Sequence, residues 1–158
     1  MPIAVGTKAP DFTLKNRQDS KMSDVTLSDH LGKDPVVLLF FPGAFTTPCT
    51  KELCDISLSW DLYSSLGAVV YGVSVDSVFA QEAWAADAGI KIPLLSDYQR
   101  KVCRAYEVTV PDFAGLGEGC GRAAFVIDRD GVVRYAEQTA QLGDMPNFAA
   151  LVEALKAL

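Results

Sequence analysis

The sequence predicts an α/β protein in which a mixed central sheet carries helices on both faces. Residues 36–41 are a continuous apolar run and residues 68–76 are rich in β-branched residues, as expected of strands that are buried on both sides. Each run is followed by a segment with apolar residues at roughly helical spacing, and this alternation favours parallel strands joined by right-handed crossovers. The 158 residues, 49% of them hydrophobic, are expected to form one domain over residues 1–158.

The remaining elements are assigned in chain order from local patterns. Residues 9–14 alternate briefly and indicate an edge strand, and residues 16–23 are expected to be a polar turn. A short extended piece at 25–27 and a capped helical turn at 28–34 then precede the first buried strand. After that strand, a loop rich in proline, glycine and threonine leads into a helix that is expected to span residues 51–66.

The second half continues the same rhythm and ends in a hairpin. Ser77 is expected to cap a helix over 78–88, and Asp97 to begin one over 98–106. Residues 110–120 are expected to be a flexible glycine loop. Residues 123–127 are a buried strand, and the turn at 128–131 returns an antiparallel strand over 132–137 at one edge of the sheet. A helix over 147–158 closes the chain.

Composition excludes several classes of function. The net charge of −6 argues against sequence-independent binding to nucleic acid or to anionic membranes. No window approaches 18 consecutive apolar residues, so no transmembrane helix is expected. The first residues have neither a basic segment nor a long apolar segment of the secretory type, which makes the cytoplasm the expected compartment.

The four cysteines, at positions 49, 54, 103 and 120, are too scattered for a disulfide scaffold and are expected to be redox or incidental thiols. They also lack the short paired spacing of structural zinc sites, and the sole histidine, His30, lies upstream in a polar segment. Neither a metal nor an organic cofactor is expected.

Cys49 is the cysteine in the most suggestive position. Thr47 is a plausible N-cap and Pro48 suits the first helical position, which places Cys49 in the first turn of the helix. Free amides and the helix dipole favour an anion there, and a thiolate is the nucleophilic form of cysteine. A lone cysteine is more often a small buried apolar residue, but the threonine and proline context favours the reactive interpretation.

The order strand, Pro42-x-x-x-Thr46-x-x-Cys49, helix resembles the active-site signature P-x-x-x-T-x-x-C of the peroxiredoxins. The similarity extends over nearly the whole chain, including residues 9–14, 72–76, 93–97 and 122–131. The resemblance implies a thioredoxin-like fold. It also implies reduction of hydrogen peroxide and organic hydroperoxides by a peroxidatic cysteine, without a metal or an organic cofactor.

The resemblance also assigns roles to individual residues. Cys49 would be the peroxidatic cysteine, Thr46 would hydrogen-bond the peroxide and the thiolate, Pro42 would shield the site from water, and Arg122 would place positive charge beside the sulfur. Such donors stabilise the negative charge that spreads over sulfur and oxygen as the O–O bond breaks. The product is a sulfenic acid. Glu52 is either an exposed helix residue or the partner that orients an arginine.

Three candidates could resolve that sulfenic acid. Cys54 has the five-residue spacing of the bacterioferritin-comigratory, or Q-type, branch, in which the second cysteine resolves the first. Five residues of helix rise about 7.5 Å, more than the roughly 7 Å between Cα atoms that a disulfide spans, so the helix is expected to unwind locally. Cys120, in the expected glycine loop, is an alternative resolver, whereas Cys103 is expected to be a core residue. Similarity of residues 125–137 to the one-cysteine AhpE-type enzymes leaves an external thiol as the third candidate.

Two other functions are compatible with the same fold. A thioredoxin-like disulfide reductase needs C-x-x-C at this junction, but Thr46 occupies the position three before Cys49. A redox-sensing or disulfide module is the non-enzymatic alternative. The expected partners are a peroxide and a thioredoxin-like reductant, and the expected assembly is a monomer or a homodimer.

Overall fold

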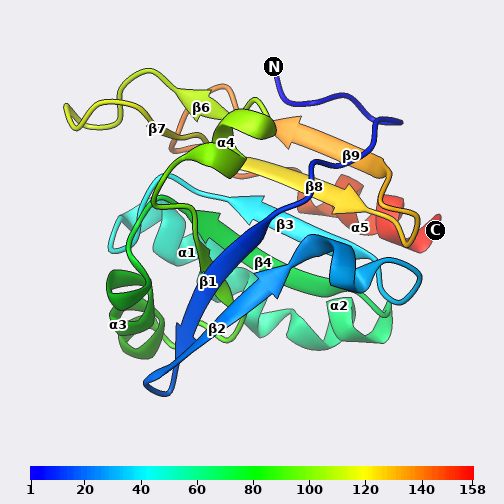
Figure 1. Cartoon of the computed structure of the whole chain (residues 1–158), viewed down its shortest axis with the longest axis horizontal. Coiled ribbons are helices and arrows are strands. Elements are labelled where there is room, and N and C mark those ends of the chain that lie inside the picture. Colours follow the sequence, from blue (N-terminus) through cyan, green and yellow to red (C-terminus); the bar gives the residue numbers. More distant parts are fainter.

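The computed structural model describes all 158 residues and is organised around a seven-stranded mixed sheet (Figure 1). Its strand order is β2-β1-β5-β4-β3-β8-β9, and a separate two-stranded ladder pairs β6 with β7. The strands are β1 (Thr13–Gln18), β2 (Lys21–Thr26), β3 (Val36–Phe40), β4 (Val69–Ser74), β5 (Leu94–Ser96), β6 (Thr109–Val110), β7 (Gly119–Cys120), β8 (Ala123–Ile127) and β9 (Val133–Gln138). The helices are the 3-10 helix η1 (Leu27–His30), α1 (Thr47–Leu58), α2 (Trp60–Ser65), α3 (Val78–Ala88), α4 (Lys101–Ala105) and α5 (Phe148–Lys156).

The centre of the sheet follows the prediction. β3 pairs in parallel with β4 and antiparallel with β8, and all five of its residues are buried. The predicted hairpin is also present, because Asp128 accepts hydrogen bonds from the N–H groups of Asp130 and Val132 while Gly131 adopts a φ of 79°. β9 therefore returns antiparallel along β8 and forms one edge of the sheet.

Two hydrophobic clusters cover the opposite faces of this sheet. One contains Cys49 and side chains from α1, α2, α3 and α5, including Leu53, Tyr63, Trp84 and Leu151. The other contains side chains from α4, η1 and the N-terminal segment, including Val102, Leu27 and Phe12. Both faces thus carry helical structure, as predicted. None of the helices combines the length and the apolar character that a membrane span requires.

The N-terminal prediction is wrong in its boundaries. The expected strand at 9–14 and polar turn at 16–23 are instead a hairpin of β1 and β2, with a tight turn at Asp19 and Ser20, whose φ angles are 52° and 62°. Most residues of both strands are exposed or half-buried, so they carry no continuous apolar pattern from which strands are recognised. β2, rather than β1, is the edge strand.

The helix expected over residues 51–66 is divided in two. α1 ends at Leu58 and α2 begins at Trp60, with Ser59 between them at φ −96° and ψ 13°. The Ser57 hydroxyl donates to the carbonyl of Leu53, and such back-bonding bends helices. The N-cap is Thr46, not Thr47, so Pro48 takes the second helical position and Cys49 still lies in the first turn.

The helix expected over 98–106 is shorter than predicted. α4 covers only Lys101–Ala105, because Arg100 adopts the left-handed conformation with φ 62°. Asp97 therefore does not begin the helix as predicted, since the N-cap is Arg100. Its carboxylate nevertheless accepts the N–H groups of Val102 and Cys103 in the first turn, at 3.1 and 2.7 Å.

Two predictions about the cysteines are wrong: a disulfide forms where none was expected, and Cys120 does not lie in a mobile loop. Cys103 is fully buried in the core, as predicted, and residues 111–118 form the loop between β6 and β7. Cys103 and Cys120 form a disulfide with a Cα–Cα distance of 5.9 Å, within the usual range. Cys120 is fully buried in β7, which pairs with β6, rather than mobile in a loop. Strands of two residues are too short to show any periodicity, and the pairing of two cysteines 17 positions apart depends on the tertiary structure.

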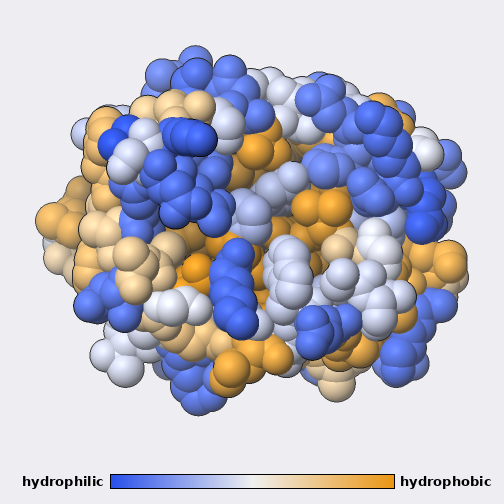
Figure 2. Space-filling view, turned by 90° about the horizontal axis from the view of Figure 1, so that it is seen from below, coloured by the Kyte–Doolittle hydropathy of each residue, from blue (hydrophilic) through white to orange (hydrophobic).

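Two cavities are found near β1 and α3. The larger, about 820 Å³, lies between β1, the start of α3 and residues 96–105, and the smaller, about 480 Å³, lies between the β1–β2 turn and α3. Figure 2 shows a face of the molecule that is hollowed at its centre, where apolar side chains are visible behind a more hydrophilic rim. Cys49 lines neither cavity.

Candidate active site

The site is built at the junction between β3 and α1. Residues 41–46 lead from the end of β3 to the N-terminus of α1, and Cys49 lies in the first helical turn with its side chain fully buried. The first intrahelical bond runs from the Thr50 N–H to the Thr46 carbonyl, so the amides before Thr50 have no partner within the helix. These amides and the helix dipole favour negative charge at Cys49.

Arg122 is brought to Cys49 by the sheet. β8 pairs antiparallel with β3 so that Phe40 faces Ala123, and Arg122 therefore enters beside the loop that follows β3. Its Nη2 donates to the Cys49 Sγ at 3.0 Å, its Nη1 to Glu52 Oε2 at 2.9 Å and its Nε to the Leu142 carbonyl at 3.0 Å. With only 1% of its surface exposed, the guanidinium is fixed in one orientation by three acceptors.

Glu52 is the charge partner of this arginine. It lies one turn after Cys49 on α1, is fully buried, and leaves its Oε1 without a hydrogen-bond partner. Burial raises the pKa of the Glu52 carboxyl to about 7, although Arg122 acts in the opposite direction. Burial also works against the charge of Arg122, but Glu52 and Cys49 outweigh it and raise the Arg122 pKa, so the guanidinium stays cationic. Of the two alternatives for Glu52, the structure selects the arginine partner.

Thr46 and Pro42 lie in the loop itself. The Thr46 hydroxyl donates to the Gly43 carbonyl at 2.8 Å and remains partly exposed, so its oxygen is free to accept another hydrogen bond. Pro42 is buried at the end of β3. The structure thus groups Pro42 and Thr46 in one loop around Cys49 but gives no direct hydrogen bond between Thr46 and the sulfur.

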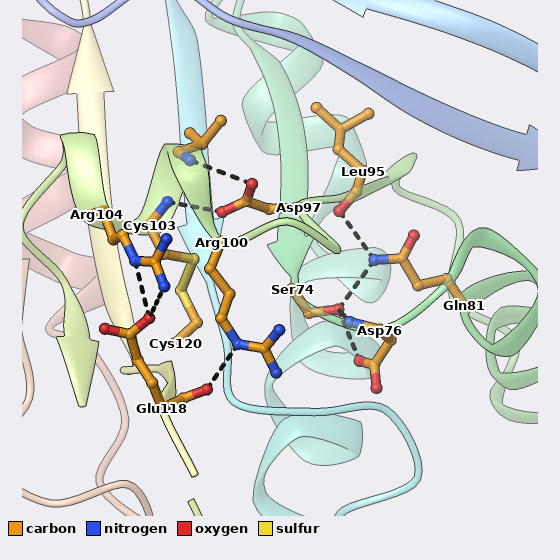
Figure 3. The surroundings of a disulfide bond; sticks show 11 residues. Ser74, Asp76, Gln81, Leu95, Asp97, Arg100, Cys103, Arg104, Glu118 and Cys120 are labelled. Carbon is orange, nitrogen blue, oxygen red and sulfur yellow. Dashed lines mark hydrogen bonds and ion pairs between the residues drawn. A yellow bond between two sulfur atoms is a disulfide. The ribbon is translucent and has the colours of Figure 1, made fainter. Parts of the chain in front are cut away.

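Asp76 is a site residue that the sequence analysis missed. Its Oδ2 accepts a hydrogen bond from the N–H of Ala44 at 2.8 Å. The same oxygen accepts from the Ser74 hydroxyl at 2.7 Å, and Ser74 in turn accepts from Gln81 (Figure 3). Parallel β3 and β4 end at the same edge of the sheet, which places Asp76 under the loop. The sequence feature that could have indicated this role is an aspartate at the end of the second expected buried strand.

Trp84 holds the first turn of α1 from the other side. Its indole N–H donates to the Thr50 hydroxyl at 3.0 Å, and that hydroxyl donates to the Thr46 carbonyl. Trp84 comes from α3 and was expected only as part of a helix. Its contact with Thr50 depends on how α3 packs, which no local pattern shows.

Cys54 remains separate from Cys49. It is half-buried on α1, and its Sγ donates to the Ala88 carbonyl at the end of α3, 3.3 Å away. Both cysteines are free thiols on a folded helix. The expected unwinding of α1 therefore stays a prediction.

Cys120 does not fit the role of alternative resolver. Its sulfur is bonded to Cys103, and both belong to the hydrophobic cluster on the face of the sheet opposite to that of Cys49. No group of three or more histidine, cysteine, aspartate or glutamate side chains is arranged to hold a metal ion.

Comparison with known proteins places this geometry in a family. A model of the AhpC/TSA family matches residues 5–136. The chain belongs to the peroxiredoxin family. It is 39% identical to the putative peroxiredoxin bcp of Coxiella burnetii over 84% of this chain and 87% of that relative. Peroxiredoxin Q from the chloroplast of Triticum aestivum is also 39% identical, over 84% of this chain and 58% of the relative. These two relatives confirm the resemblance to the bacterioferritin-comigratory, Q-type branch.

Some of the matched peroxiredoxins are longer than this chain. The 2-Cys peroxiredoxin BAS1 of Hordeum vulgare is 34% identical over 84% of the chain, and the matched region covers 64% of that relative. Among solved structures, BcpB of Mycobacterium tuberculosis superposes with a TM-score of 0.83 at 30% identity, over 98% of this peroxiredoxin and 97% of that chain. The reduced 2-Cys peroxiredoxin of Plasmodium vivax superposes with a TM-score of 0.85 at 27% identity, over 99% of this chain and 82% of that chain. The predicted thioredoxin-like fold is confirmed.

Proposed function

We propose that this peroxiredoxin is a thiol-dependent peroxidase that reduces hydrogen peroxide and organic hydroperoxides through Cys49. The observation that carries the proposal is the 3.0 Å contact between the Arg122 guanidinium and the buried Cys49 sulfur at the N-terminus of α1. The family and its relatives support the same reaction class.

The chemistry is a two-electron displacement at oxygen. The Cys49 thiolate attacks one peroxide oxygen, an S–O bond forms and the O–O bond breaks. The sulfur is oxidised to a sulfenic acid, and the departing hydroxide or alkoxide takes a proton from solvent to leave as water or alcohol. Arg122 and the free amides of α1 stabilise the negative charge that spreads over the three reacting atoms.

The loop residues complete the site. The Thr46 oxygen accepts a hydrogen bond from the O–H of the incoming peroxide, while the Thr46 hydroxyl continues to donate to the Gly43 carbonyl. Pro42, buried at the base of the loop, excludes water. Asp76 holds the loop by the Ala44 N–H, so the hydroxyl is positioned before the peroxide arrives.

In this proposal Cys54 resolves the sulfenic acid. Its thiol attacks the oxidised Cys49 sulfur, which yields a Cys49–Cys54 disulfide and water, and a thioredoxin-like dithiol then reduces that disulfide. The first turns of α1 must open and the bond from Cys54 to Ala88 must break. Resolution by an external thiol is the alternative.

Peptide mapping after one equivalent of peroxide distinguishes these routes. We expect a Cys49–Cys54 link in the wild type, a persistent sulfenic acid in Cys54→Ser, and no peroxide consumption by Cys49→Ser. A stable wild-type sulfenic acid would assign resolution to an external thiol. Insulin reduction without peroxide consumption would favour a disulfide reductase. The absence of both activities would favour a redox-sensing module.

The proposal extends to the setting in which the protein acts. Residues 1–158 work as one domain, supported by the contacts of the N-terminal segment, where the Ile3 and Gly6 N–H groups bond to the carbonyls of Tyr106 and Val133. It acts in the cytoplasm on peroxide and a thioredoxin-like reductant, as a monomer or homodimer, without binding nucleic acid or membranes. Cell fractionation and light scattering of the purified protein test these points.

A further inference from the structure

The disulfide between Cys103 and Cys120 has no part in the mechanism above. It links α4 to β7 across 17 residues, and both cysteines are fully buried (Figure 3). It lies on the face of the sheet opposite to Cys49, so it is not positioned to exchange directly with the peroxidatic sulfur. It can affect the site only through the segment that it anchors.

That segment is the β6–β7 arm, residues 109–121. Its ladder joins only Thr109 to Cys120 and Val110 to Gly119. Beyond this ladder and the disulfide, Glu118 anchors the arm (Figure 3). Its carbonyl accepts a hydrogen bond from Arg100 at 2.7 Å, and its carboxylate accepts hydrogen bonds from Arg104. The Arg104–Glu118 pair is partly exposed and contributes little by itself. The disulfide is the one covalent tie on the arm.

The β6–β7 arm reaches the active-site loop at Gly43. A Cβ placed on Gly43 would lie 3.2 Å from the Phe113 ring, so the loop backbone packs directly against this side chain. Gly43 is the residue whose carbonyl accepts the Thr46 hydroxyl. A shift of Phe113 would therefore move Gly43 and, through it, the Thr46 hydroxyl that is proposed to bind peroxide.

The arm also ends at the catalytic arginine. Cys120 is two residues before Arg122, and the intervening Gly121 donates to the Val108 carbonyl at 2.7 Å. A Cβ on Gly121 would lie 2.9 Å from that same oxygen, so the backbone between the disulfide and Arg122 is tightly confined. The disulfide thus anchors both the residue that packs on Gly43 and the backbone that carries Arg122.

We propose that Cys103 and Cys120 are a second redox site, a dithiol/disulfide pair that controls the reactivity of Cys49 through the β6–β7 arm. In the disulfide form the arm holds Arg122 and the Gly43–Thr46 turn in position for peroxide. In the dithiol form the arm loosens, and oxidation of Cys49 slows. The cysteines act as positioning residues, and the effect on rate rests on the proposed peroxidase function.

The redox step is a thiol–disulfide exchange with a dithiol reductant of the thioredoxin-like class. One reductant thiolate attacks a sulfur of the pair, breaks the Cys103–Cys120 bond and forms a mixed disulfide. The second reductant thiol then attacks the reductant sulfur of this mixed disulfide and releases the protein cysteine as a thiol. The pair gains two electrons and two protons, and the reductant becomes a disulfide. Because both sulfurs are buried, the arm must open before attack, which makes reduction slower than at an exposed disulfide.

The test compares two wild-type forms that both have Cys49 reduced but differ at Cys103 and Cys120. Graded dithiothreitol, with thiols counted by alkylation and mass spectrometry, prepares them. The rate of Cys49 oxidation by hydrogen peroxide is then followed in a single turnover. We expect the dithiol form to be about 10- to 100-fold slower, since misplacement of a reacting group by about 1 Å has effects of this size.

A variant pair provides the matched control. Cys103→Ala/Cys120→Ala should reproduce the slow rate, whereas Val102→Ala, which removes buried apolar atoms from the same helix and keeps the disulfide, should not. Amide exchange across residues 42–46 and 109–122 should rise on reduction of the pair. Equal rates or equal protection in the two wild-type forms would overturn the inference alone, while a wild type without peroxidase activity would overturn the proposed function itself.

Discussion

At the residue scale, the site depends on the three acceptors of one arginine. Each donor nitrogen of Arg122 has its own partner, in the sulfur of Cys49, the carboxylate of Glu52 and the carbonyl of Leu142. A planar guanidinium suits this arrangement, since its donors are fixed relative to one another, whereas a lysine ammonium is a flexible point charge. A buried ion pair contributes little to stability because desolvation offsets the attraction, so its presence here is better explained by function.

Replacing Arg122 by lysine tests the guanidinium geometry. Arg122→Lys keeps a positive charge but loses the fork, and we expect Cys49 oxidation to slow by about 10²–10³-fold, as when one preorganised donor is removed. Stopped-flow measurement of the first turnover gives this rate. Arg134→Lys, at a half-exposed arginine paired with Asp128, is the control and should keep the wild-type rate. A loss of less than threefold in Arg122→Lys would contradict the assigned role.

Glu52 should give the protein a distinctive pH dependence. Burial raises its pKa from 4.5 to about 7 on folding, so between these values the folded state holds a proton that the unfolded state has released. The stability contributed by this group is therefore present below pH 4.5 and is lost as pH rises toward 7. Urea unfolding at pH 5, 6 and 7 should show a decline of roughly 2 kcal/mol in the wild type relative to Glu52→Gln. Parallel pH profiles for the two proteins would contradict the shift.

At the element scale, α1 has two opposed tasks. In the proposed mechanism its N-terminus must be folded to present Cys49, yet it must open for Cys54 to reach the oxidised sulfur. The Thr46 side chain does not cap the helix, and the first turn of α1 contains no acidic residue. This end is therefore held by tertiary contacts, in which Arg122 donates to Cys49 and Glu52 and the Trp84 indole donates to the Thr50 hydroxyl. A helix end without capping contacts of its own opens once such tertiary contacts are broken.

Oxidation should therefore release amide protection in α1. With Cys49 linked to Cys54, we expect hydrogen exchange across residues 46–56 to become faster than in the reduced protein, because the disulfide cannot form on an intact helix. Exchange measured by mass spectrometry should change little in α3, which is capped by Ser77 and ended by Gly89. Unchanged protection across 46–56 in the oxidised protein would show that α1 need not unwind.

At the scale of the whole molecule, the sheet joins elements that are distant in sequence. β3 lies between β4 and β8, so it brings Asp76 and Arg122 to the two sides of the loop that it leads into. The two faces of the sheet then divide the cysteines, with Cys49 and Cys54 on one face and the disulfide on the other.

The disulfide should also stabilise the whole fold. A loop of this length, closed by cysteines 17 positions apart, corresponds to about 3 kcal/mol in the chain-entropy model. We expect urea unfolding of Cys49→Ser/Cys54→Ser, in which only Cys103 and Cys120 respond, to occur at lower urea after reduction. The same variant without reductant is the reference. Coincident curves would show that the disulfide contributes nothing to stability.

The sequence by itself determined the features that depend on neighbouring residues. The buried strands β3, β4 and β8, the capped helix α3 and the position of Cys49 in a first helical turn all follow from apolar runs and from capping residues within a few positions of each other. The family resemblance added Arg122 as a candidate, because its motif includes a residue that no local pattern connects to Cys49.

Only the tertiary structure decided the contacts that make this a site. The pairing of β3 with β8 sets Arg122 beside Cys49, burial turns Glu52 into its partner, and the packing of α4 on β7 joins Cys103 to Cys120. These contacts cross tens of residues of sequence. Their energies arise from burial and from strand pairing, which exist only once the whole sheet has formed.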